Sequence, residues 1–92
     1  MDAQLFWNPE KEEWLKRERD LSFRFVVEAF ERGKEISDIQ HPDARRPHQR
    51  MLLFKLGKYI CAVPYVPDGE KKFLKTMYLS RDWTKALGEK HE

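Results

Sequence analysis

Cationic, imidazole and phenolic side chains gather in the second half of the chain, where predicted strands begin and end. The set comprises His48, Arg50, Lys72, Lys75, Tyr78 and Arg81. Adjacent antiparallel strands can bring such groups together on one open face. Their chemistry suits RNA cleavage without a metal. A base takes the proton from a 2′-hydroxyl, cations stabilise the charge of the transition state, and an acid protonates the leaving oxygen.

Roles within this set follow from side-chain chemistry. His48 is the natural titrating group near neutral pH. Arg50 and Arg81 can make bidentate contacts with phosphate that a lysine cannot make, and Lys75 supplies a supporting cation. Each residue also has an ordinary structural interpretation: the cations are solvated strand positions, Tyr78 is a half-buried core aromatic, and Arg81 caps a helix end. The recurrence of basic residues at strand ends favours the functional interpretation.

Other catalytic chemistries find no support in the sequence. His41 and His48 have no cysteine nearby, so neither a metal site nor a cofactor is predicted. A glycine-rich phosphate loop and a nucleophile elbow are both absent from the sequence. The single cysteine, Cys61, lies in an apolar stretch and is expected to be buried and inert. His41 is expected to organise the loop bounded by Pro42 and Pro47.

Charge divides the chain into unequal parts. Its 92 residues suffice for one core, so residues 1–92 are expected to form a single domain. Residues 1–44 hold 7 basic and 11 acidic side chains, a net charge of −4, whereas residues 45–85 hold 10 and 3, a net charge of +7. The basic part can attract a polyanion such as RNA, unless the acidic part folds against it and cancels the field.

The composition is that of a globular chain with a highly charged surface. Hydrophobic residues make up 40% and charged residues 37%, and no apolar run approaches the roughly 20 residues that span a bilayer. The start, Met1-Asp2-Ala3-Gln4, has neither the basic nor the apolar region of a signal peptide. We therefore expect a cytoplasmic location and no membrane partner.

Two helices are predicted in the first half, after a short strand at residues 5–7. The first helix opens with Asn8 as its N-cap and Pro9 at its first position, and it carries acidic residues early and basic residues late. Ser22 caps the second helix, which stops at Gly33. Its core-facing apolar stripe consists of Phe23, Val26, Val27 and Phe30.

Strands dominate the second half. They are predicted at residues 36–40, 50–56, 59–66 and 72–79, with a hairpin turn at Gly57-Lys58, a second turn at residues 67–70 and a last helix at residues 81–87. Pro64 must sit at a bulge or at an unpaired position of its strand. The order predicts an α+β fold, in which the two N-terminal helices and a short C-terminal helix pack on one face of an antiparallel meander.

Four segments form an ordered set along nearly the whole chain. They are Phe6-Trp7-Asn8-Pro9-Glu10-Lys11, Arg19-Asp20-Leu21-Ser22-Phe23, His48-Gln49-Arg50 and Ser80-Arg81-Asp82-Trp83-Thr84. This set resembles the BrnT-type toxins of bacterial type II toxin–antitoxin modules. The last three segments lie where that family has Lys-His-Gly before an apolar residue, Ser and Phe, then Gly-Glu-x-Arg, then Ala-Arg-Lys-Ala-Thr. The chain differs from these patterns at His48, Asp20 and Asp82-Trp83.

The resemblance implies a fold similar to the RelE ribonucleases, metal-free RNA cleavage and neutralisation by a cognate antitoxin that also binds DNA. The family's functional residues map to Arg19, Arg50 and Arg81, and Lys75 lies near the position of a further arginine. The predicted catalytic residues are thus His48, Arg50, Lys75 and Arg81. The predicted RNA-binding residues are Arg19, Lys72 and Tyr78.

Two other interpretations stay open. A non-enzymatic module can use the same basic face to bind nucleic acid, and a degenerate toxin can act only through protein partners. A homodimer and a toxin–antitoxin heterotetramer both fit the resemblance.

Overall fold

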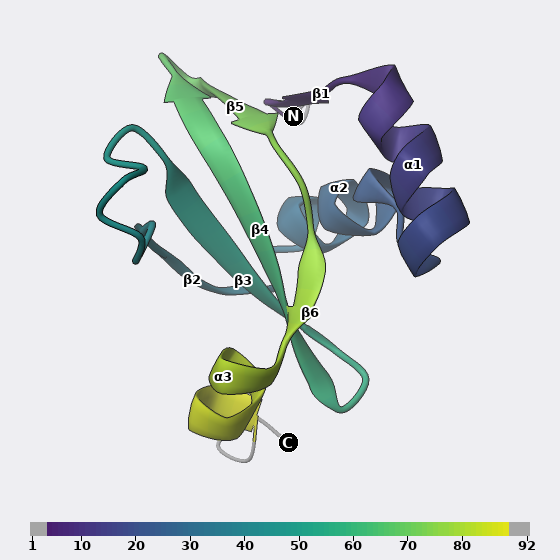
Figure 1. Cartoon of the computed structure of the whole chain (residues 1–92), viewed down its shortest axis with the longest axis vertical. Helices are drawn as coiled ribbons and strands as arrows, with labels where there is room; N and C mark the ends of the chain where they lie inside the picture. Colours follow the sequence, from purple (N-terminus) through teal and green to yellow (C-terminus); the bar gives the residue numbers. More distant parts are fainter. Residues whose placement is uncertain (1–3, 89–92) are drawn as a thin grey trace.

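The chain folds into a six-stranded sheet with helices on both faces (Figure 1). The structure is a computed structural model, and it describes residues 4–88. Its elements in chain order are β1 (Leu5–Trp7), α1 (Pro9–Arg19), α2 (Phe23–Glu31), β2 (Glu35–Gln40), β3 (Arg50–Leu56), β4 (Tyr59–Asp68), β5 (Lys71–Leu74), β6 (Tyr78–Ser80), α3 (Arg81–Trp83) and a π-helical turn, Thr84–Gly88. The predicted α+β class is confirmed. Over residues 4–88, no helix has the length and apolar character needed to cross a membrane.

The sheet is mixed, not purely antiparallel. Its strands lie in the order β1-β5-β4-β3-β2, and β6 pairs with β4 beyond the end of β5. Strands β2 to β5 form the predicted antiparallel meander, but β1 pairs with β5 in parallel. The prediction of an antiparallel sheet is therefore wrong at this edge. No tight turn joins β1 to β5, so the local sequence does not set their relative direction.

The predicted caps start both N-terminal helices. The Asn8 side chain accepts a hydrogen bond from the Glu10 N–H at 2.8 Å, and Pro9 follows at the first helical position. The Ser22 hydroxyl accepts from the Arg24 N–H at 3.1 Å. Each contact satisfies one of the N–H groups that a helix start leaves without a partner.

A buried carboxylate joins the two helices. Glu12 of α1 accepts hydrogen bonds from the Ser22 hydroxyl at 2.6 Å and from the Phe23 N–H at 2.8 Å. Its negative charge thus lies at the start of α2, where the helix dipole favours it. In the sequence, Glu12 is one of the acidic residues in the first turn of α1. In the structure, its hydrogen bonds to Ser22 and Phe23 hold α2 against α1.

The sheet separates two apolar clusters. On one face, α1 and α2 bury their apolar stripes, among them Leu15 and Phe23, against β3 and β4. On the opposite face, Trp83 and Leu87 pack against side chains of the same two strands. Because both faces are covered, Met51 to Phe54 are all buried, although successive strand residues point to opposite faces. The expectation that all helices share one face is therefore wrong: α3 lies opposite α1 and α2.

Cys61 lies within the cluster beneath α1 and α2, as expected. Burial raises the pKa of its thiol to about 12. The thiol therefore stays protonated near neutral pH, and a protonated buried thiol is a poor nucleophile.

Candidate functional site

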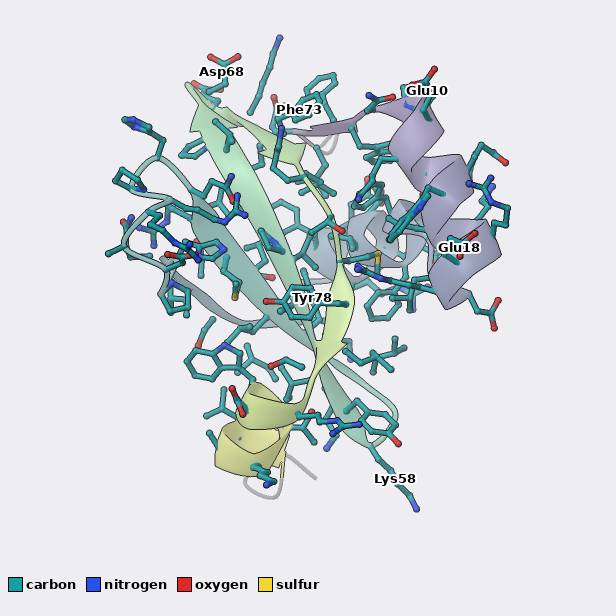
Figure 2. The ribbon with its side chains drawn as sticks, viewed as in Figure 1. Glu10, Glu18, Lys58, Asp68, Phe73 and Tyr78 are labelled. Atoms are coloured by element: carbon teal, nitrogen blue, oxygen red, sulfur yellow. The ribbon has the colours of Figure 1, made fainter. Side chains whose placement is uncertain are left out.

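A concave pocket of about 290 Å³ lies between the loop at residues 41–49 and the edge formed by β5 and β6. Its lining residues are His41, Arg46, Gln49, Pro64, Lys75, Thr76 and Tyr78. Tyr78 also packs on the cluster beneath α3, so the pocket opens on the face opposite α1 and α2. In Figure 2 the Tyr78 side chain extends from β6 across the front of β4.

An inserted residue between β5 and β6 directs two of the lining side chains. Tyr65 pairs with Leu74, and Ala62 pairs with Tyr78, so three steps along β4 correspond to four steps along the opposing chain. This is the pattern of a β-bulge. The extra residue changes the alternation of faces. Leu74 and Met77 both enter the core beneath α1 and α2, whereas Lys75 and Tyr78 both line the pocket.

Pro64 explains why the ladder breaks at this point. Its carbonyl accepts a hydrogen bond from the Lys75 N–H at 2.9 Å, but a proline has no N–H to return. The prediction that Pro64 occupies a bulge or an unpaired position is confirmed on the β5–β6 side of β4, although Pro64 pairs with Met51 of β3 on the other side. The strand predicted at residues 72–79 is accordingly two short strands, β5 and β6.

Arg19 braces the bulge from the end of α1. Its guanidinium donates to the Met77 carbonyl at 2.8 Å and to the Thr76 hydroxyl at 3.3 Å, and it lies 4.7 Å from the centre of the Trp14 ring. The bulged backbone carbonyl thereby gains a partner that the β4 ladder does not supply. Arg19, predicted to bind RNA, is placed to support Lys75 and Tyr78 through the backbone between them.

His41 organises the loop on the other side of the pocket, as predicted. Its Nδ1 accepts a hydrogen bond from the Asp43 N–H at 3.1 Å, and its own backbone N–H donates to the Gln49 carbonyl at 3.1 Å. In the neutral ring the proton is therefore assigned to Nε2, which is the nitrogen left for a ligand. Asp43 also contacts Arg45 at 3.1 Å and Arg46 at 3.8 Å. Hydrogen bonds from Arg45 lower the pKa of the Asp43 carboxyl to about 2.

Tyr78 and Lys75 present complementary groups. Burial raises the pKa of the Tyr78 hydroxyl above its ordinary value, so this group is a protonated donor at neutral pH. The Lys75 side chain is exposed, and its Nζ lies 5.5 Å from the centre of the Phe73 ring. The pocket thus combines a phenol, an imidazole and two cations, which suits an anionic ligand.

Arg50 and Lys72 lie on the other face of the sheet. Arg50 pairs across the ladder with Tyr65, which belongs to the cluster beneath α1 and α2. Its Nε lies 3.0 Å from Asp38 Oδ1, and its Nη2 donates to the Asp38 carbonyl at 2.7 Å. Lys72 Nζ lies 5.4 Å from the Tyr65 ring centre and 5.4 Å from that of Phe30. The expectation that these cations share one open face with Lys75 and Tyr78 is therefore wrong.

Tyr65 completes this second cluster. Its hydroxyl lies 2.8 Å from each carboxylate oxygen of Asp38. Burial, reinforced by the hydrogen bond to Asp38, raises the pKa of Tyr65 to about 12. The cluster is thus a neutral phenol and an ion pair that satisfy one another.

His48 and Arg81 remain exposed outside the pocket. His48 precedes the lining residue Gln49, and Arg81 is the first residue of α3. With the part of the chain that the structure describes, neither side chain forms a hydrogen bond or an ion pair. The structure therefore brings Lys75 and Tyr78 together from the predicted set, and leaves His48 outside the pocket, next to the lining residue Gln49 in the chain.

His41, Arg46 and Thr76 line the pocket without having been predicted as site residues. The sequence did carry a signal for His41 and Arg46, because residues 41–46 combine a histidine with two arginines in a proline-bounded loop. Thr76 gave no such signal, since its position depends on the bulge.

Comparisons with protein-family models, with curated proteins and with solved structures find no match to this chain. Within residues 4–88, no three His, Cys, Asp or Glu side chains come together as a candidate metal site.

Proposed function

We propose that the protein is the ribonuclease toxin of a type II toxin–antitoxin module, with the arrangement of a RelE- or BrnT-like fold. It cleaves cytoplasmic RNA without a metal and is neutralised by a cognate antitoxin. One observation carries this proposal: a single pocket collects His41, Arg46, Lys75 and Tyr78. The ordered resemblance of the four sequence segments supports it independently.

The reaction needs no group beyond the RNA and these side chains. The 2′-oxygen attacks the adjacent phosphorus and the bond to the 5′-oxygen breaks, which leaves a 2′,3′-cyclic phosphate and a 5′-hydroxyl. Lys75 and Arg46 stabilise the extra negative charge of the transition state, and the Tyr78 hydroxyl donates a hydrogen bond to it. The imidazole of His48 accepts the 2′-proton and delivers it to the leaving 5′-oxygen. His41, whose Nδ1 already accepts the Asp43 N–H, donates a hydrogen bond from Nε2 to the phosphate. Arg81, exposed at the start of α3, binds a flanking phosphate.

A cleavage assay on end-labelled single-stranded RNA with a chelator present tests this proposal. Lys75→Ala is expected to reduce the rate by about 10²-fold, because it removes a cation from the developing charge. Lys58→Ala is the matched control, since Lys58 lies at the β3–β4 turn, far from the pocket (Figure 2). Wild type should yield cyclic phosphate ends, and a 2′-deoxy sugar at the scissile position should block the reaction.

Two results would overturn the proposal. One is an absence of cleavage together with normal growth of cells that express the wild-type protein. The other is an equal loss of activity in Lys58→Ala and Lys75→Ala, which would show that cleavage does not depend on the pocket. In cells, an adjacent reading frame that encodes a DNA-binding protein should relieve the growth arrest.

The second candidate is a non-enzymatic nucleic-acid-binding module. The observation that favours it is the ion pair between Arg50 and Asp38, since the resemblance implies that this arginine should serve the reaction. Tight, salt-dependent RNA binding without any cleaved product would support this candidate.

A further inference from the structure

Two phenylalanines lie side by side on the surface of the sheet. Phe6 of β1 and Phe73 of β5 are directly paired, and the two residues are 46% and 38% exposed. Directly paired residues point to the same face. A single exposed apolar side chain is ordinary, but a contiguous aromatic surface indicates a binding site.

This pair lies on the same face as the pocket. Phe73 pairs with Val66 of β4, and Val66 shares a face with Pro64, two residues earlier, which lines the pocket. Leu5 and Trp7, on either side of Phe6, point the other way, into the cluster beneath α1 and α2. Figure 1 shows β1 and β5 at the end of the sheet away from α3, so this part of the face is left uncovered by the helix.

A lysine accompanies each ring. Lys71 Nζ lies 5.2 Å from the centre of Phe6, and Lys75 Nζ lies 5.5 Å from the centre of Phe73. Both rings line a hollow of about 270 Å³, together with Lys71 and Asp68. This lining holds one acidic and one basic side chain, Asp68 and Lys71, and Lys75 adds a second cation beside Phe73. Since Lys75 also lines the pocket, the aromatic surface continues into it.

We propose that Phe6 and Phe73 form a stacking platform for the bases of single-stranded RNA, while Lys71 and Lys75 bind the neighbouring phosphates. Alternating aromatic rings and cations match a strand whose bases and phosphates alternate. A duplex hides the faces of its bases, so single strands, loops and bulges are the substrates selected. This inference rests on the proposed function in taking RNA as the ligand, and it adds which part of the RNA is recognised.

Binding of a 2′-O-methyl oligonucleotide, which cannot be cleaved, tests the platform by fluorescence anisotropy. Phe73→Ala and Phe6→Ala are each expected to weaken binding by about tenfold, as the loss of one stacked base does. Phe73→Leu should weaken binding similarly, and Phe73→Tyr should retain it, because the aromatic face and not the apolar bulk is required. Tyr59→Ala is the matched control, since Tyr59 is an exposed aromatic at the β3–β4 hairpin.

An abasic oligonucleotide of the same length separates stacking from charge without changing the protein. Wild type should bind the abasic strand about as weakly as the double variant Phe6→Ala/Phe73→Ala binds the normal strand, and the Phe73→Ala substitution should not weaken binding of the abasic strand. Circular dichroism of each variant confirms that it is folded.

The platform is overturned if both alanine variants bind the normal strand like wild type, or if the abasic strand binds wild type equally well. It is also overturned if the variants lose only a protein partner, since the rings are then a protein docking surface. Failure of the proposed function looks different. Ring-dependent binding without cleavage leaves the platform standing, whereas cleavage with ring-independent binding removes the platform alone.

Discussion

Two tyrosines of one sheet serve different purposes because their neighbours differ. The Tyr65 hydroxyl is held by both oxygens of Asp38, whose charge is in turn matched by Arg50. Such a cluster is already satisfied, so it has little to offer a ligand. The Tyr78 hydroxyl lines an open pocket beside Lys75 and is available to donate. Availability of a polar group, more than its residue type, distinguishes the candidate site from the rest of the surface.

Arg50→Ala should reduce the melting temperature slightly and leave RNA cleavage within about threefold of wild type. The reason is that Arg50 contacts Asp38 on the face opposite the pocket. Thermal unfolding and the cleavage assay are measured on the same preparation, with Lys75→Ala as the comparison. A variant that melts like wild type but loses as much cleavage as Lys75→Ala would contradict this placement and restore the catalytic role that the family resemblance implies.

At the scale of elements, the broken strand β5–β6 does most to shape the site. A regular strand from Lys72 to Leu79 would put Lys75 and Tyr78 on opposite faces, because side chains alternate. The bulge opposite Pro64 adds one residue and brings the two to the same face. Arg19 then stabilises the displaced backbone through the Met77 carbonyl.

Deletion of Thr76 tests this role of the bulge. Removing one residue restores a regular alternation, in which Leu74 and Met77 still enter the core and Lys75 and Tyr78 still face the pocket. The variant is therefore expected to fold, but the spacing between Lys75 and Tyr78 shortens to that of two adjacent same-face positions. A displacement of this size should reduce cleavage by about 10²-fold or more.

Thr76→Ala is the control, because it keeps the chain length and loses only the hydroxyl that contacts Arg19. It should retain most of the activity. Full activity in the deletion variant would show that the bulge has no part in assembling the site.

Much of this architecture was predictable from the sequence, and the predictions that were wrong have identifiable physical causes. Caps at Asn8 and Ser22 and the hairpin at Gly57 are local signals, and the structure confirms them. Pro64 predicted a break in the strand pairing of β4. Whether the break falls on the β3 side or on the β5–β6 side depends on the partner strands, which the local sequence does not specify. The face assignment of Arg50 likewise depends on strand register, which a period of two makes sensitive to a one-residue slip. Sequence reasoning therefore located the elements and their basic ends, but not which cations share a face.

For the molecule as a whole, the sheet acts as a partition. One face is closed by α1 and α2, and Arg50 at its margin is paired with Asp38. The other face is covered by α3 at one end and presents the pocket and the platform at the other. The net charge of +7 in residues 45–85 is thus divided between the two faces. Under the proposed function, Lys71 and Lys75 on the open face are the cations that follow the RNA backbone.

This division predicts how binding should depend on salt. Each phosphate contact with a single strand contributes about −0.7 to the slope of log affinity against log salt concentration, because it releases condensed counterions. Lys71→Ala and Lys75→Ala should therefore each make the slope of 2′-O-methyl oligonucleotide binding less steep by about 0.7. Lys58→Ala, with the same change of net charge at the far hairpin, should leave the slope unchanged. If all three variants reduce the slope equally, RNA is held by the overall positive field of the protein and not by a defined path across the open face.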